Sequence, residues 1–276
     1  MGTITVDAAP DYATITGRQQ KVWSAGDYSV VAARIPVISE LLCDAADLRA
    51  GSRVLDVAGG SGNTALAAAR QGARVVSLDY VPSLLERART RAAAEGLEIE
   101  TVEGDAQALP FPDRSFDAVV SAVGAMFAPD QRRTAAEMLR VCRAGGTIAL
   151  ANWTPEGFIG GLFKTVGAYV PPPPGLTPPP RWGVEDHVRD LLGDGVRDLR
   201  MRRREYTWRV TSPHEFVELF RDTYGPTVVA FGGLEPEERD ALAAELVELA
   251  RRFDRNGGNG PVAIPAEYLE VVATRA

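Results

Sequence analysis

The residues best suited to chemistry lie in SRVLDVAGGSGNTALAAA, residues 52–69. The β-branched start of this segment is typical of a strand, and its alanine-rich end is typical of a helix. Between them, Gly59, Gly60 and Gly62 allow a sharp turn and let a ligand approach the backbone without a Cβ in the way. Because the first turn of the helix presents free N–H groups, we expect a nucleotide-like ligand at the carboxyl end of the strand.

Asp56 indicates which kind of nucleotide this is. Residues 60–65 fit the short dinucleotide pattern GxGxxA, but Asp56 comes just before the glycines, at the end of the strand. It would repel a pyrophosphate about 4 Å away by about 4 kcal/mol at an effective dielectric constant of about 20. S-adenosylmethionine carries an amine and a sulfonium but no phosphate, so the same carboxylate would attract it. A second interpretation, compatible with the first, is that Asp56 caps the helix or braces the loop.

Two later segments, VVSLDYVPSLL and EGDAQALPFPDRSFDAVVSA, offer further ligand contacts. Asp79 ends the second predicted strand, where a carboxylate accepts hydrogen bonds from both ribose hydroxyls of either NAD or S-adenosylmethionine. Tyr80 is either a partner for the adenine face or a surface tyrosine. After the third strand, Asp105 is placed to accept from the adenine amino group, and the Ala106 N–H to donate to a ring nitrogen. Ser121 ends the fourth strand and is expected to line the cleft.

The elements that must position these residues alternate along the chain. Strands are expected at 53–57, 74–78, 99–102, 117–121 and 147–151, and helices at 30–42, 63–71, 83–95 and 132–143. Strands separated by single helices indicate a parallel sheet that is covered on both faces and joined by right-handed crossovers.

The alternation ends after residue 152, where FIGGLFKTVGAYVPPPPGLTPPPRWG is apolar, aromatic and rich in proline. Its prolines favour stiff polyproline II and exclude helix interiors, and its aromatic residues predict that it packs over the sheet rather than serving as an SH3-type ligand. Aromatic side chains near the cleft suggest a pocket for an apolar or aromatic small molecule, or else a lid that buries its own rings. These side chains are Trp153, Phe158, Phe163, Tyr169 and Trp182.

The segments VLDVAGGSGN, VVSLDYVPSLL and GDAQALPFPDRSFDAVV, in this order and spacing, closely resemble class I S-adenosylmethionine-dependent methyltransferases. Within that class the chain is similar to the ubiquinone- and menaquinone-biosynthesis type, the methyltransferase-11-like group, over about residues 50–152. The resemblance implies a Rossmann-like, doubly wound α/β fold with a seven-stranded, mostly parallel sheet of order 3-2-1-4-5-7-6. It also implies N-terminal helices and an insertion after strand 5.

The same resemblance implies ligand contacts. The methionine moiety falls on Gly59, Gly60 and Gly62, the ribose on Asp79, and the adenine on Asp105 and Ala106. The sequence departs from the family at Ala58, where relatives often carry glycine or cysteine. RQQKVWSAGDYS, residues 18–29, resembles the helices that cover the cofactor, so Trp23 and Tyr28 are candidates to contact the methionine end or the substrate. Alternatively, Trp23 only anchors a helix to the core.

The expected organisation has four parts. Residues 1–50 form a helical cap, 51–152 a core that binds S-adenosylmethionine, 153–196 an aromatic and proline-rich lid, and 197–276 the completion of the sheet.

Composition limits the partners of these 276 residues. The net charge of −7 disfavours nucleic acids and anionic lipid surfaces, and the dense basic run RMRRRE, residues 200–205, is interpreted as a solvated strand edge. No apolar stretch reaches membrane-spanning length and no secretory signal is visible, so a cytoplasmic protein is expected. Two cysteines and two histidines at these spacings predict neither a disulfide framework nor a metal site.

The chemistry implied is methyl transfer to an O, N or C nucleophile of an apolar or aromatic small molecule, with secondary metabolism as one setting and S-adenosylhomocysteine as product. The sulfonium methyl is already electrophilic, so the protein must align the nucleophile and exclude water. His187 is the better histidine candidate for a general base, against the alternative of a helix-surface histidine. Two other functions stay open: cofactor binding without methyl transfer, as in a cyclase or regulator, and a nicotinamide-dependent oxidoreductase.

Overall fold

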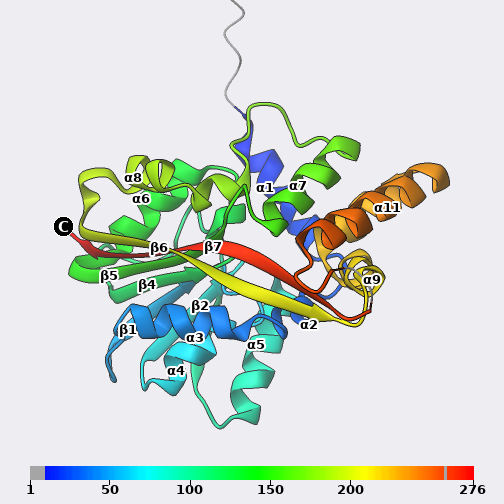
Figure 1. Ribbon diagram of the computed structural model, residues 1–276. Helices are drawn as coiled ribbons and strands as arrows, with labels where there is room; N and C mark the ends of the chain where they lie inside the picture. The colour runs from blue at the N-terminus through cyan, green and yellow to red at the C-terminus, as the bar shows by residue number, and fades with distance from the viewer. Residues whose placement is uncertain (1–9, 258–259) are drawn as a thin grey trace, which may run out of the picture.

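A seven-stranded sheet runs through the protein in the computed structural model, which describes residues 10–257 and 260–276 (Figure 1). The strands are β1 (Arg53–Val57), β2 (Arg74–Asp79), β3 (Ile99–Glu103), β4 (Phe116–Ala122), β5 (Cys142–Trp153), β6 (Val196–Val210) and β7 (Val262–Arg275). Their order is β3-β2-β1-β4-β5-β7-β6, and only the pairs that involve β7 are antiparallel. This arrangement confirms the predicted fold class and strand order.

Helices cover both faces of the sheet. They are α1 (Tyr12–Trp23), α2 (Tyr28–Ala32), α3 (Pro36–Ala45), α4 (Asn63–Arg70), α5 (Pro82–Ala94), α6 (Gln131–Val141), α7 (Phe158–Tyr169), α8 (Glu185–Leu192), α9 (Pro213–Thr223), α10 (Gly225–Gly233) and α11 (Pro236–Phe253). In Figure 1, α3, α4 and α5 lie on one face, and α6 and α8 on the other. Within the described ranges, no helix has the length and apolar character needed to cross a membrane.

The central strands are apolar because both of their faces are covered. In β1, Val54, Leu55 and Val57 are fully buried, and Leu55 pairs with Val76 of β2 and Val119 of β4. Parallel strands end at the same edge of a sheet, so the loops that follow β1, β2 and β4 come together there.

The N-terminal prediction of one continuous helix over 30–42 is wrong. The chain forms two helices instead, because α2 ends at Ala32 and α3 begins at Pro36. Proline has no N–H to donate and disfavours the helical conformation at the residue before it. Ile35 accordingly has φ −116° and ψ 26°, and the second helix starts with proline in its first turn.

The fifth strand is longer than predicted, and the helix before it is shorter. Helix α6 ends at Val141, and β5 already begins at Cys142. Gly146 allows this tight passage, because a Cβ there would lie 2.7 Å from the Asp117 carbonyl oxygen and 2.8 Å from the Cys142 sulfur. Periodicity could not show this close approach, since it depends on a neighbouring strand.

The insertion after β5 is only partly a surface lid. It forms α7, a short 3-10 helix η2 (Pro179–Gly183) and α8, and α7 packs against α11 beyond the end of the sheet (Figure 1). Trp153, Phe158 and Trp182 are buried in the main core, whereas Phe163 and Tyr169 are only partly buried. Most of these rings therefore serve the packing of the protein itself.

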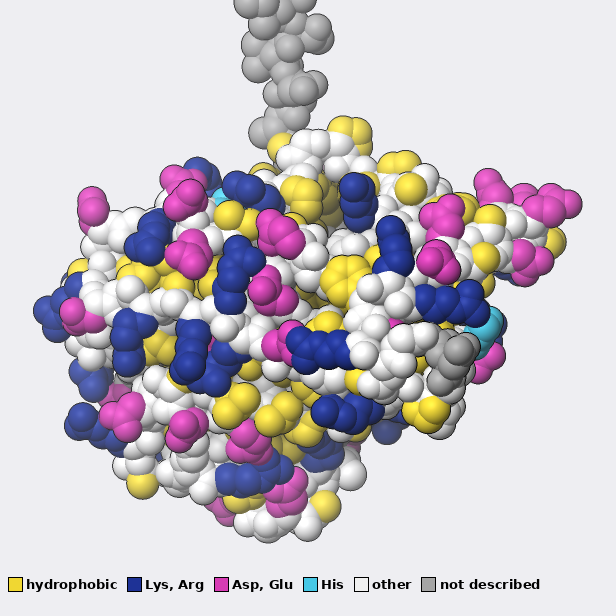
Figure 2. Space-filling model, in the orientation of Figure 1, with side chains coloured by type: hydrophobic (Ala, Val, Ile, Leu, Met, Phe, Trp, Pro, Cys, Tyr) yellow, Lys and Arg dark blue, Asp and Glu magenta, His cyan; other side chains and the backbone are white. Residues whose placement is uncertain are grey.

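The basic run in β6 lies at the edge of the sheet, as predicted. Arg203 pairs with Glu267 at 2.7 Å and Arg204 with Glu270 at 2.6 Å, in both cases across to β7. The face shown in Figure 2 carries acidic and basic side chains intermixed. A surface of this kind has no continuous positive path for a phosphate backbone.

We predict that Gly225→Ala loosens the N-terminal helices. A Cβ at this first residue of α10 would lie 2.3 Å from the Val22 carbonyl oxygen of α1, so the two helices would have to separate. The expected loss is about 1 to 3 kcal/mol in the free energy of unfolding, measured with urea. Gly232→Ala, in the same helix with no atom within 4 Å of the new Cβ, is the matched control and should not destabilise. Equal effects of the two changes would contradict this packing.

Candidate functional site

The turn after β1 is built so that only glycine fits at one position. A Cβ at Gly59 would lie 2.3 Å from the Ser77 hydroxyl oxygen and 2.6 Å from a carboxylate oxygen of Asp56. Gly60 and Gly62 have φ of +54° and +89°, which glycine adopts without strain. The sharp turn after β1 is therefore present as the glycine spacing predicted, and the structure adds that the loop lies directly against β2.

Asp56 lies under this loop, away from the cavity wall. It is fully buried, and one of its oxygens accepts a hydrogen bond of 2.9 Å from the Ala65 N–H in the first turn of α4. Burial raises the pKa of Asp56 to about 8, although the Ala65 hydrogen bond opposes the shift. At neutral pH this carboxyl is largely uncharged, so the contact present is the loop-bracing one and attraction of a cationic ligand does not rest on Asp56.

Asp79 is the carboxylate that faces the cavity. Its two oxygens accept hydrogen bonds from the Gly60 N–H at 2.9 Å and the Val81 N–H at 2.8 Å. Each carboxylate oxygen has a second lone pair, so two ligand hydroxyls can still be accepted. Burial raises the pKa of Asp79 to about 6, while the hydrogen bonds from Val81 and Gly60 lower it, so the group is mostly ionised at pH 7.

Two adjoining cavities form what we call the central cleft. The larger, about 50 Å³, is lined by Trp23, Tyr28, Ala58, Gly60, Asp79, Tyr80, Val81, Leu84, Ala106, Val123, Gly124, Phe127 and Ala128. The smaller, about 30 Å³, shares Tyr28, Ala58, Gly60 and Val123 with it and adds Gly59. The structure thus brings together seven of the predicted site residues, from the cap, the glycine loop, β2 and the segment after β3.

The N-terminal helices close this cleft. The Trp23 ring packs edge-on against Tyr28, Phe127 and Tyr224, with ring centroids 5.4, 4.8 and 5.3 Å apart. From the same helix, the Gln20 amide donates to the Tyr80 carbonyl at 2.6 Å. Ligand sites for cofactors usually measure about 300 Å³ or more, so the central cleft as it stands is narrower than a nucleotide site.

Three predicted site residues support the wall from behind. The Ser121 hydroxyl donates to the Val57 carbonyl at 2.7 Å and accepts from the Ala125 N–H at 2.9 Å. Gly62 lies on the other side of the loop, where a Cβ would be 2.9 Å from Ala88 of α5. Both therefore tie neighbouring elements to the cleft, although neither lines it.

Asp105 is the third of these supporting residues. Both its oxygens accept from the Gln107 side-chain amide, at 3.1 and 3.0 Å, and one also accepts from the Gln107 N–H. Gln107 in turn donates to the Thr16 hydroxyl of α1 at 2.8 Å. Of the residues that follow β3, only Ala106 lines the larger cavity. Adenine recognition by Asp105 therefore stays a prediction.

His187 lies outside the cleft. Its Nε2 is 2.7 Å from the side-chain oxygen of Gln131, whose amide donates to the carbonyls of Thr177 and Pro178. Burial, with the charge of Arg181, lowers the pKa of His187, so it is neutral at pH 7. His187 thus joins α8 to α6, and its role as a base stays unsupported by any contact with the cleft.

Sequence reasoning did not identify Val123, Phe127 and Leu84 as wall residues. Val123 has φ +53°, which is unusual for a β-branched side chain and stores strain at the end of β4. Ala58 also has φ +53°, a conformation in which glycine would be unstrained. The departure from the family at this position therefore indicated a strained backbone in the turn.

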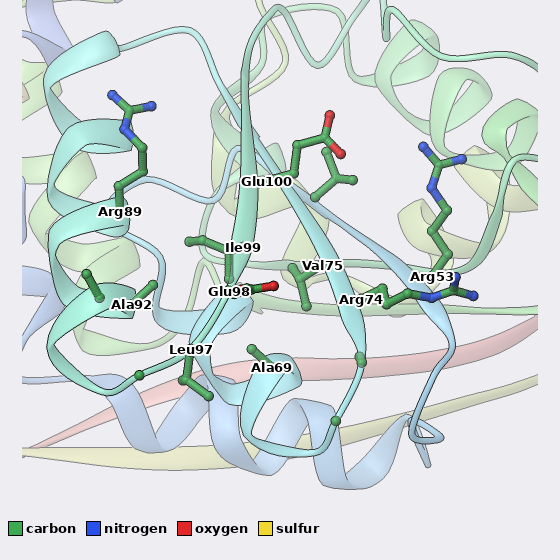
Figure 3. Close-up of a pocket in the computed structure, with 15 residues that line it drawn as sticks. Arg53, Ala69, Arg74, Val75, Arg89, Ala92, Leu97, Glu98, Ile99 and Glu100 are labelled. Atoms are coloured by element: carbon green, nitrogen blue, oxygen red, sulfur yellow. The ribbon is translucent and has the colours of Figure 1, made fainter.

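A hollow larger than the central cleft, about 830 Å³, lies at the opposite edge of the sheet, near the amino ends of β1, β2 and β3 (Figure 3). It is wide open, and its side chains Arg53, Arg74 and Arg89 point to different sides. Arg53 donates to the Ser115 carbonyl and Arg74 to the Gly51 carbonyl. These side chains do not converge on one ligand, so we assign the function to the central cleft despite its smaller volume. In the part of the chain that the structure describes, no cluster of three metal-binding side chains occurs.

Comparison with known proteins agrees with this geometry. A family model described as a methyltransferase domain matches residues 55–150. An uncharacterized protein of Mycobacterium tuberculosis is 42% identical over 280 residues, covering 99% of both chains. Demethylmenaquinone methyltransferase of Thermus thermophilus is 37% identical over 153 residues, covering 50% of this chain and 70% of that enzyme.

The fold also matches solved structures. The crystal structure of SpnF, described as a 4+2 cyclase, aligns with a TM-score of 0.60 and 17% identity over 97% of both chains. At this identity the likeness shows the fold alone. The sequence matches show the family: the chain belongs to the S-adenosylmethionine-dependent methyltransferases, and S-adenosylmethionine is its cofactor.

We predict that Asp79→Ala weakens binding of S-adenosylhomocysteine by about 1.5 to 3 kcal/mol, roughly 10- to 150-fold, because charge-assisted hydrogen bonds are lost. Isothermal calorimetry measures this. Glu103→Ala is the matched control, because Glu103 is the exposed register partner of Asp79 on the neighbouring strand. An unchanged affinity in Asp79→Ala would mean that the ligand binds elsewhere.

We predict a pH-dependent stability that comes from Asp56. The pKa of Asp56 is about 8 in the folded protein and 3.8 in the reference state. Between pH 3.8 and 8 the folded protein therefore holds a proton on Asp56 that the unfolded chain has lost. The free energy of unfolding accordingly falls as the pH rises toward 8. The slope from this group is at most about 1.4 kcal/mol per pH unit. Urea unfolding at several pH values should show a flatter profile for Asp56→Asn than for the unchanged protein. Parallel profiles would refute the assignment.

Proposed function

We propose that the protein transfers a methyl group from S-adenosylmethionine to an oxygen, nitrogen or carbon of an apolar or aromatic small molecule. The observation that carries the proposal is the ionised, partly satisfied Asp79 on the wall of a cleft that also contains the glycine loop. The named relative from Thermus methylates an apolar aromatic acceptor according to its name, which supports the same acceptor class here.

The roles that we propose follow from the walls of the cleft. Gly59 and Gly60 present backbone to the methionine moiety, Asp79 accepts from the ribose, and Tyr80 and Ala106 flank the adenine. The bound cofactor supplies a methyl group that a sulfonium has already made electrophilic. What remains for the chain is to exclude water and hold the nucleophile in line, which is the work of the cap (residues 1–50) and the lid (residues 153–196) in the division that we propose.

The sequence leaves two alternatives to methyl transfer. The nicotinamide-dependent alternative has no support in the family or its cofactor. The second alternative is a protein that binds S-adenosylmethionine without transferring its methyl group, because one fold can serve several reactions.

We predict label transfer when the protein is incubated with methyl-labelled S-adenosylmethionine and a panel of apolar aromatic alcohols, amines and acidic carbon compounds. Extraction into an organic solvent followed by mass spectrometry identifies the product, and Asp79→Ala should reduce the rate at subsaturating cofactor. Tight binding of S-adenosylhomocysteine with no transfer to any acceptor would favour binding without methyl transfer. Transfer to nucleic acid instead would contradict the proposed acceptor class.

A further inference from the structure

A third cavity adjoins the central cleft, and nothing in the proposed function assigns it. We call it the aromatic cavity; it is small, about 10 Å³, and is lined by Tyr28, Val31, Ile35, Val123, Trp153, Ile159, Trp208, Phe220 and Tyr224. These residues come from the cap, from the ends of β4, β5 and β6, from α7 and from the region of α9 and α10. Parts of the chain that are far apart in sequence therefore meet at this one point.

The position of the aromatic cavity relates it to methyl transfer. Tyr28 and Val123 line it and also line both cavities of the central cleft. All three spaces thus meet at these two side chains. A molecule in the aromatic cavity would face a cofactor in the central cleft across this junction, which is where a reacting methyl group has to pass.

The lining of the aromatic cavity selects against charge. It contains no carboxylate, amine, guanidinium or imidazole group. Burial raises the pKa of the Tyr28 hydroxyl and also that of Tyr224, so both phenols stay neutral. An ion placed among these side chains would lose its hydration and meet no group of opposite charge, so a neutral ligand is favoured.

One residue of this wall, Trp208, carries a buried polar atom without a partner among the described residues. Trp208 is 1% exposed, and its indole N–H makes no hydrogen bond to any described residue. Buried tryptophan N–H groups usually find an acceptor. The ring is fixed by edge-on contacts with Tyr206, Phe216 and Phe220, at centroid distances of 5.3, 5.6 and 5.5 Å, so it does not readily turn away.

We propose that the aromatic cavity is the acceptor site, that it takes a neutral ring compound bearing a carbonyl or similar oxygen, and that the Trp208 N–H binds this oxygen. The inference rests on the proposed function, and it assigns Trp208 as a specificity residue at that site. Tyr28 belongs to the five-residue helix α2, and its ring has to shift for a ligand of two rings to fit.

The test uses three probes with one carbon frame: 1-tetralone, which has a carbonyl oxygen, tetralin, which has none, and 1,2,3,4-tetrahydro-2-naphthoate, which is charged. Calorimetry measures their binding with and without saturating S-adenosylhomocysteine. We expect the unchanged protein to bind tetralone about fivefold more tightly than tetralin, as one neutral hydrogen bond allows. The carboxylate should bind more weakly than either.

The matched variants are Trp208→Phe and Trp182→Phe. Trp182 is as deeply buried and its N–H also lacks a partner among the described residues, but it does not line the aromatic cavity. Trp208→Phe should abolish the preference for tetralone while tetralin still binds, whereas Trp182→Phe should retain the preference. Retained tetralin binding separates the loss of one hydrogen bond from general misfolding.

Three results would overturn the inference: equal affinity of the unchanged protein for tetralone and tetralin, a preference that survives in Trp208→Phe, or carboxylate binding as tight as tetralone binding. Failure of the proposed function looks different, because no labelled methyl group would then pass to any acceptor, whether or not S-adenosylhomocysteine binds. The ratio of tetralone to tetralin affinity, measured without the nucleotide, would still test the aromatic cavity in that case.

Discussion

The close contact between the glycine loop and strand β2 is the constraint on which the site depends. Gly59 lies so near Ser77 and Asp56 that no side chain fits there, and the Gly60 N–H is thereby brought to the Asp79 carboxylate at 2.9 Å. One hydrogen bond thus fixes the loop and orients the acidic group. Gly60 and Asp79 both line the central cleft, so a backbone contact holds this part of the wall in place before any ligand is present.

The two carboxyl groups near the glycine loop, Asp56 and Asp79, differ in burial and therefore in charge. Asp56 is fully buried and largely uncharged at neutral pH, so it holds the start of α4. Asp79, with a pKa of about 6, is mostly charged and borders the cavity. Two carboxylates at the ends of neighbouring strands therefore have different roles, because their surroundings differ rather than their chemistry.

Local pattern was enough to predict a parallel sheet and the position of the glycine loop, because strand, turn and helix signals are encoded in adjacent residues. The order of the strands came from the resemblance to the family. Local pattern gave no information on contacts between distant segments. Ser121 and Asp105 were expected on the wall, but they bond to Val57 and Gln107, and periodicity says nothing about such pairings. Val123 was missed because no residue pattern marks a strained φ at a β-branched side chain. Pro36 is present in the sequence, but the helical spacing of apolar residues over 30–42 masked the break that this proline causes between α2 and α3.

Strand β7, at the very end of the chain, lies between β5 and β6. Strand β6 joins the sheet only through β7, so Trp208 reaches its place only once the last residues are available. During synthesis on the ribosome, strands β1 to β5 can form before β7 has emerged. The wall that contains Trp208 forms only after β7 has paired with β6. Loss of β7 would accordingly leave β6, which carries Trp208 of the aromatic cavity, without its only partner strand among the described residues.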